Sequence, residues 1–194
     1  MITYDDKTAL VVVDVQNDFA DPKGSLYVPG GEEVVPAVND EVGRALAVGA
    51  MVVYTQDWHP ESTPHFQKDG GVWPVHCVME TWGAELHSDL EVDGPVVRKG
   101  SNGEDGYSGF TMRDPETGKE MPTPLRAMLE DKGIERVVVV GLALDVCVKA
   151  TALDAVTGFE TTVVVGASAP VELQPGDGAR AIEELEQNRV VIVG

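Results

Sequence analysis

Continuously apolar runs alternate with amphipathic stretches along almost the whole chain. The run at 8–15, TALVVVDV, is apolar from Ala9 to Val13 without the polar alternation of a half-exposed strand. A strand that is apolar on both faces is typical of a parallel sheet covered by helices on both sides. Five similar runs predict further strands, at 51–57, 96–100, 136–141, 161–166 and 189–193.

The stretches between these runs predict helices. Four segments have helical spacing of apolar residues: 32–50, 123–133, 145–158 and 177–188. The segment 123–133 has Thr123 as its expected N-cap, Pro124 at the first position and Gly133 at the end. Because strands and helices alternate, we expect a three-layer α-β-α fold with a central, mostly parallel six-stranded sheet. No repeat or linker divides the chain, so residues 1–194 are expected to form one domain.

Composition excludes several classes of protein. The net charge of −19 argues against nucleic acid or an anionic membrane as a partner, because both repel an acidic protein. Two cysteines argue against a disulfide scaffold. The N-terminal segment has neither a basic region nor an apolar run long enough for a signal peptide or a membrane span. A cytoplasmic protein is therefore expected.

Polar residues lie at or just past the carboxyl ends of four of the predicted strands. Ligands of parallel α/β sheets bind outside the carboxyl ends of the strands, where the strand order reverses. The residues at these ends come from distant parts of the chain: Asp14, Asp57 with His59, Lys99, and Cys147. We expect them to meet at one edge of the sheet.

The segment Thr55–Cys77 is the richest in metal-binding side chains, with three of the four histidines in the chain. Asp57 and His59 are two residues apart, so in an extended segment their side chains point the same way. His65 and His76 lie in the loop beyond and are free to fold back over them. One carboxylate with two or three imidazoles is a ligand set for a borderline divalent metal.

A second set of residues suggests nucleophilic catalysis, although each member has an ordinary structural role as its alternative. Taken alone, Cys147 in an apolar helix would be a core residue, Asp14 a turn cap and Lys99 a surface cation. Taken together, the three residues predict a nucleophile with a base and a cation beside it. The first turn of a helix and a nearby lysine would favour the thiolate of Cys147. A carboxylate beside the thiol could take its proton and hand it to a leaving amine.

Six segments carry a resemblance to a known family over almost the whole chain: LVVVDVQNDF, VVYTQDWHP, WPVHCV with TWGAELH, RKG, YSGF and GLALDVCVKATALDA. In these segments the sequence resembles the nicotinamidases (pyrazinamidases) of the isochorismatase-like cysteine hydrolase superfamily. The resemblance implies hydrolysis of nicotinamide, and of pyrazinamide as well, to the acid and ammonia through a thioester. It also implies a small-molecule aromatic carboxamide as the partner, and self-association of the chain as found in relatives.

The resemblance assigns a role to each site residue. Cys147 would be the nucleophile, Asp14 the base and later the acid, and Lys99 the group that stabilises both. Metal ligands would be Asp57, His59 and His76, with His65 as an additional one. The ion would most often be zinc, with iron or manganese as alternatives, and it would orient the substrate ring.

The resemblance also places the pocket around the nucleophile. It implies a cis peptide bond between Leu142 and Ala143, and an oxyanion hole formed by the amides of Ala143 and Cys147. Three aromatic residues in matched loops would hold the ring, namely Phe19, Trp73 and Tyr107. Four residues depart from the family pattern and are expected to touch the pocket wall or the turn: Glu80, Trp82, Leu144 and Val146.

Two other functions fit parts of this pattern. One is a different amide hydrolase of the same superfamily, which the intact metal-ligand set argues against. The other is a catalytically silent module that binds a metal or a ligand, which the complete set of Asp14, Lys99 and Cys147 argues against.

Overall fold

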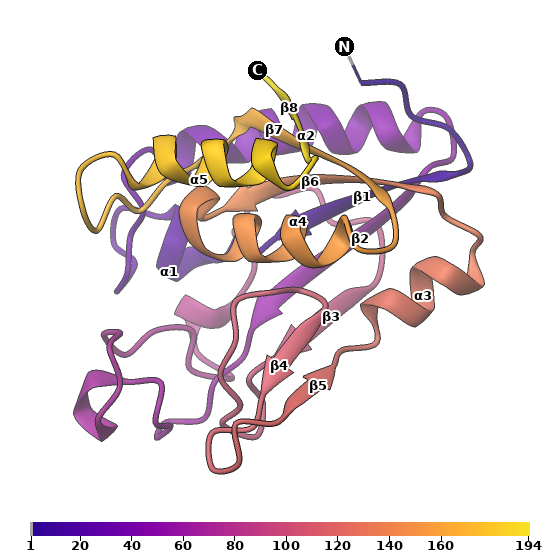
Figure 1. Cartoon of the computed structure of the whole chain (residues 1–194). Coiled ribbons are helices and arrows are strands. Elements are labelled where there is room, and N and C mark those ends of the chain that lie inside the picture. The colour runs from indigo at the N-terminus through magenta and orange to yellow at the C-terminus, as the bar shows by residue number, and fades with distance from the viewer. Residues whose placement is uncertain (1) are drawn as a thin grey trace.

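Six parallel strands form the centre of the computed structural model, which describes residues 2–194 (Figure 1). Their spatial order is β3 (Val96–Lys99), β2 (Met51–Asp57), β1 (Thr8–Val13), β6 (Arg136–Leu142), β7 (Glu160–Ala169) and β8 (Val191–Val193). Every neighbouring pair in this sheet is parallel. The predicted α/β fold with six strands is therefore confirmed.

Helices cover both faces of the sheet, because alternate residues of a strand face opposite sides. Leu10 and Val12 of β1 belong to the apolar core under α2 (Gly31–Leu46). Val11 and Val13 belong to the core on the other face, with residues of the remaining long helices. These are α3 (Leu125–Asp131), α4 (Lys149–Ala155) and α5 (Asp177–Gln187). Figure 1 shows α4 and α5 on one side of the sheet and α2 on the other.

Short elements lie outside this pattern and were not predicted. They are α1 (Asn17–Ala20), two 3₁₀ turns (Gln67–Asp69 and Trp82–Ala84), and the antiparallel hairpin of β4 (Thr111–Arg113) with β5 (Glu120–Pro122). The hairpin strands are three residues long and largely exposed, so no apolar run marks them. The predicted helix 145–158 begins instead with a π-helical turn, Leu144–Val148, which precedes α4. Cys147 lies in that turn.

Strand order creates a crevice between β1 and β6. The chain builds β2 and then β3 on one side of β1, and crosses back to place β6 on the other side. The connections that leave the carboxyl ends of β1 and β6 therefore diverge, as they do at the ligand crevice of other open α/β sheets. Asp14 directly follows β1, and Cys147 lies in the turn after β6.

The helices that the structure describes include none long and apolar enough to cross a lipid bilayer.

Candidate active site

The crevice brings Asp14, Lys99 and Cys147 together, as predicted from their places at strand ends. Lys99 Nζ lies 2.9 Å from Asp14 Oδ2 and 4.0 Å from Cys147 Sγ. All three residues are buried. Asp14 leaves β1 in a left-handed conformation, with φ of 48°, and its Oδ1 accepts a hydrogen bond of 2.7 Å from the hydroxyl of Thr55. That hydroxyl leaves Asp14 little freedom to turn away from Lys99.

Charge in this cluster is balanced by Lys99. Burial by itself would lower the pKa of the lysine, but Asp14 and Asp57 raise it well above its usual value, so the lysine is charged. Burial raises the pKa of Asp14, and Lys99 opposes that rise. Burial also raises the pKa of the Cys147 thiol well above its usual value, and the nearby carboxylates add to the effect.

The expectation that the helix turn and Lys99 lower the pKa of Cys147 is therefore wrong for the free protein. The physical reason is burial beside two carboxylates, which outweighs the attraction of Lys99. Before it can attack a substrate the thiol must lose its proton to a neighbouring base. Asp14 is in place for that, because ligand atoms of Asp14, Asp57 and Cys147 all lie within 4.8 Å of one another.

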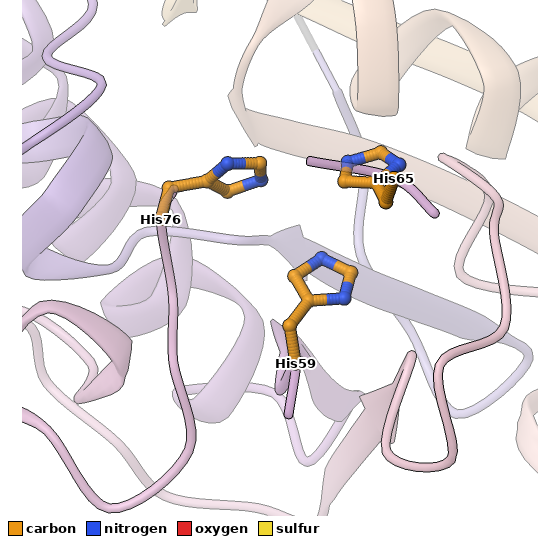
Figure 2. Close-up of side chains that lie close together, drawn as sticks. All are labelled: His59, His65 and His76. Carbon is orange, nitrogen blue, oxygen red and sulfur yellow. The ribbon is translucent and has the colours of Figure 1, made fainter. Parts of the chain in front are cut away.

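Three histidines form a second cluster beside the first. Ring nitrogens of His59, His65 and His76 lie within 4.8 Å of one another, and all three residues are buried. Figure 2 shows the three rings converging on a common space. His59 comes from the end of β2, whereas His65 and His76 come from the long loop that follows. The loop folds back as expected.

Hydrogen bonds to Nδ1 orient two of the three rings. His65 Nδ1 lies 2.7 Å from Asp105 Oδ1, and His76 Nδ1 lies 2.7 Å from the carbonyl oxygen of Pro74. Each contact leaves Nε2 free to face the cluster, which is how ligating histidines are held in metal sites. Neither Asp105 nor Pro74 was predicted, because Asp105 is distant from His65 in the sequence and the contact of the Pro74 carbonyl depends on the local backbone conformation.

The chemistry of these donors fits a divalent metal. Both ring nitrogens of His59 are buried and have no hydrogen-bond partner among residues 2–194. A buried polar atom without a partner is costly, unless the site is built to bind something there. Asp57 Oδ2 lies 3.9 Å from His59 Nε2, so a carboxylate faces the three imidazoles. Three imidazoles and one carboxylate are ligands that zinc and other first-row ions accept.

Asp57 connects the two clusters. One carboxylate oxygen pairs with Lys99, and the other faces His59. Burial would raise its pKa, but Lys99 and the histidines lower the pKa to about 2, so Asp57 is ionised. The side chain of Gln16 fixes its backbone, donating to the Asp57 carbonyl and accepting from the Asp57 amide, both at 2.8 Å. Gln16 was not predicted as part of the site.

A cavity of about 370 Å³, including its open mouth, lies between the two clusters. Its polar lining is Asp57, His65, His76 and Cys147, and its apolar and aromatic lining is Phe19, Leu26, Val28, Trp73, Tyr107, Ala143, Val146 and Val171. The three predicted aromatic residues thus reach one cavity. The Trp73 indole donates a hydrogen bond of 3.0 Å to the Tyr107 hydroxyl, which fixes both rings. Leu26, Val28 and Val171 were missed, because an apolar wall residue looks like any core residue in a sequence.

Residues that depart from the family pattern fall mostly outside this cavity. Val146 lines it, but Leu144 is buried in the core instead. Glu80 and Trp82 are exposed and do not belong to the lining. The expectation that all four residues touch the pocket wall or the turn is therefore corrected for Glu80 and Trp82. A match of neighbouring residues to a family pattern does not say whether a side chain in the same loop points to the cavity or to solvent.

The turn before Cys147 has the expected backbone. The peptide bond between Leu142 and Ala143 is cis. The carbonyl oxygen of Ala143 accepts hydrogen bonds from the amides of Val146 and Val148, at 3.1 and 3.0 Å. Ala143 and Cys147 both line the cavity. The oxyanion hole formed by their amides stays a prediction.

A buried carboxylate that was not predicted supports the loop carrying His76. Asp18 accepts hydrogen bonds from the amides of Ser25, at 2.9 Å, and of Cys77, at 2.7 Å. Cys77 has a φ of 45°, a left-handed conformation that is unfavourable for a residue with a side chain. Gly83 packs against Asp18 so closely that a methyl group there would overlap the carboxylate.

Replacing Gly83 with alanine is expected to lower the free energy of unfolding by about 1–3 kcal/mol, because the added methyl group forces Asp18 or a backbone segment to move. Urea denaturation measures the change. Gly43→Ala is the matched control, since Gly43 lies within α2 and open space surrounds the site of its added methyl group. That variant is expected to gain up to about 1 kcal/mol. Equal stability of Gly83→Ala and the wild type would contradict the contact.

Comparison with known proteins gives the family. The isochorismatase domain matches residues 8–193. The nicotinamidase of Escherichia coli (strain K12) is 36% identical over 196 aligned residues, which cover 91% of this chain and 90% of the relative. The pyrazinamidase of Pyrococcus horikoshii, solved in complex with zinc, superposes with a TM-score of 0.85 at 40% identity and covers 96% of this chain and 98% of that one. PnC1 from L. infantum, solved in complex with nicotinate, has a TM-score of 0.88 at 35% identity and covers 99% of this chain and 95% of that one. The chain therefore belongs to the isochorismatase family.

Proposed function

We propose that this protein is a nicotinamidase, an amidohydrolase that converts nicotinamide to nicotinate and ammonia through a thioester on Cys147. One observation carries the proposal. The thiol of Cys147, with Asp14 and Lys99 beside it, lines one cavity together with His65 and His76 of the histidine cluster and three aromatic rings. The nicotinamidase from Escherichia coli and the nicotinate complex of the L. infantum protein support the same substrate.

The chain's own groups account for the first half of the reaction. Asp14 removes the thiol proton of Cys147, and Lys99 stabilises the negative charge that passes between them. The sulfur then attacks the carboxamide carbon, and the carbonyl oxygen takes up the negative charge. The amides of Ala143 and Cys147 are the donors proposed for that oxyanion. Asp14 returns its proton to the nitrogen, the C–N bond breaks, and ammonia leaves a thioester.

The second half uses the same groups in reverse. Asp14 takes a proton from a water molecule as that water attacks the thioester carbon. The C–S bond breaks, Asp14 returns the proton to the Cys147 sulfur, and the nicotinic acid that forms loses its remaining proton to solvent as nicotinate. The raised pKa of Cys147 suits this step, because the enzyme ends each cycle with a protonated thiol.

Asp57, His59, His65 and His76 are the residues proposed to hold a divalent metal, with zinc as the first candidate and iron or manganese as alternatives. The bound ion would supply a Lewis-acid site that orients the ring nitrogen of the substrate. The pyrazinamidase of Pyrococcus horikoshii in complex with zinc supports zinc. Phe19, Trp73 and Tyr107 are proposed to pack against the flat ring.

Ammonia release from nicotinamide, followed before and after chelator treatment, tests the proposed function. We expect release by the purified protein, its loss when the metal is removed, and its return with zinc, iron or manganese. Pyrazinamide in the same assay is expected to be hydrolysed as well. No release from nicotinamide in any metal form would contradict the assignment, and full release by metal-free protein would contradict the role of the histidine cluster.

A further inference from the structure

The carboxylate of Asp145, two residues before the nucleophile, binds the backbone of the loop that carries Val171, a residue that lines the cavity. One of its oxygens accepts a hydrogen bond of 2.8 Å from the amide of Val171, and the other accepts one of 2.9 Å from the amide of Glu172. Two consecutive amides thus bind the two oxygens of one carboxylate. Only an acceptor on both atoms satisfies both amides, so an aspartate fits and an asparagine does not.

A second carboxylate, that of Glu172, stabilises the same loop near the start of α5. Glu172 has a φ of 55°, a left-handed conformation that needs support in a residue with a side chain. Its own carboxylate accepts hydrogen bonds from the amides of Gly176, at 2.6 Å, and Gly178, at 2.9 Å, where α5 begins. We call the two hydrogen bonds from Val171 and Glu172 to Asp145 the clamp. The clamped segment is the loop between β7 and α5 in Figure 1.

The clamp ends at the cavity. Val171 lines it together with Val146 and Cys147, which come from the turn that carries Asp145. The strands beneath are also paired, because Leu142 of β6 is the register partner of Ala169 of β7. Asp145 thus links the nucleophile's turn to Val171 of the apolar wall by hydrogen bonds, and it is not itself a residue of the cavity lining.

We propose that Asp145 is a positioning residue that sets the width of the substrate cavity by clamping Val171 against the turn of the nucleophile. The proposal rests on the proposed nicotinamidase function. With the clamp in place, the wall at Val171 rejects rings larger than that of nicotinamide. Without it the loop moves outward, so nicotinamide binds less tightly and a bulkier ring is tolerated better.

Asp145→Asn tests this with almost no change in side-chain volume. Its amide group places a donor against one of the two backbone amides. We expect the KM for nicotinamide to rise about tenfold, with kcat within about threefold of the wild type. The preference for nicotinamide over 5-methylnicotinamide, as a ratio of kcat/KM values, is expected to fall about fivefold or more, because a hydrophobic pocket discriminates a single added methyl group by roughly 10-fold or more.

Two further variants separate positioning from general damage. Asp5→Asn also changes a carboxylate to an amide, at a site before the amino end of β1 where Asp5 accepts hydrogen bonds from the amide of Lys7 and from Arg136, and it should change neither KM nor selectivity. Val171→Ala removes the wall but keeps the clamped amide. In that background Asp145→Asn should change KM by less than about twofold, because the residue through which it acts is gone.

A KM and a selectivity for Asp145→Asn equal to those of the wild type would overturn the proposal, as would an equal effect of that substitution in the Val171→Ala background. Failure of the function itself is recognised separately, since the wild type would then release no ammonia. Hydrogen exchange of the segment 170–176 tests the clamp without any substrate. We expect faster exchange at Val171 and Glu172 in Asp145→Asn and not in Asp5→Asn, and unchanged exchange would overturn the clamp.

Discussion

Replacing Cys147 with alanine is expected to abolish ammonia release from nicotinamide, with a loss of about 10⁴-fold or more in kcat. The reason is that Asp14 and Lys99 serve a sulfur that is no longer there, and neither of them is placed to attack in its stead. Steady-state assays of purified protein measure the loss. Acid-quenched wild-type protein should also carry the mass of a nicotinoyl group on Cys147 during turnover, and the variant should carry none.

The second cysteine of the chain provides the control for this loss. Cys77 is buried in the core beside α2 and does not line the cavity. Cys77→Ala keeps the complete set of Asp14, Lys99 and Cys147 and is expected to retain activity within about tenfold, with a modest loss of stability from the smaller side chain. Metal content should stay near that of the wild type in Cys147→Ala. Turnover by Cys147→Ala would contradict the thioester mechanism. Loss of metal from Cys147→Ala would show that Cys147 belongs to the metal site and not to a separate catalytic cluster.

Replacing His76 with alanine is expected to weaken metal binding by about 100-fold or more and to raise the KM for nicotinamide. The substitution removes one of three imidazoles whose nitrogens lie within 4.8 Å of one another, whereas loss of an outer partner alone typically costs 10–100-fold in metal affinity. Metal content after purification and competition with a coloured chelator measure the affinity independently of any activity.

His87 is the matched control, because it is the one remaining histidine of the chain and lies outside the cluster. Its Nδ1 accepts the amide of Asp89 at 3.2 Å in a partly exposed turn. His87→Ala is expected to bind metal like the wild type. Normal metal affinity in His76→Ala, or an equal loss in His87→Ala, would remove the histidine cluster as the metal site.

Much of the fold follows from local pattern. Strands β1 and β6 are apolar on both faces, and such runs predict a parallel sheet with helices on both sides before any contact is known. In such a sheet every carboxyl end faces the same edge. Asp14, Asp57, Lys99 and Cys147 could therefore be assigned to one site from their places after strands, although they are far apart along the chain.

Tertiary structure decided which of these groups touch and in what state they are. The sequence placed Cys147 in the first turn of a helix, where the helix dipole and Lys99 were expected to lower the pKa of the thiol, but the fold buries the thiol beside two carboxylates and raises its pKa. The sequence grouped Asp57 with the metal ligands, whereas the fold also pairs it with Lys99. Protonation depends on burial and on charges several ångströms away, and neither is a property of the local sequence.

The sequence by itself thus determined the sheet, the edge where the candidate site lies and the residue types that meet there, because the apolar pattern of the strands is local and parallel strands end at the same edge. Only the tertiary structure revealed the supporting contacts of Gln16, Asp18, Asp105 and Asp145, and the apolar wall of Leu26, Val28 and Val171. These residues act through partners that are distant in sequence, and the loops that bring them together have no period from which the contact could be predicted.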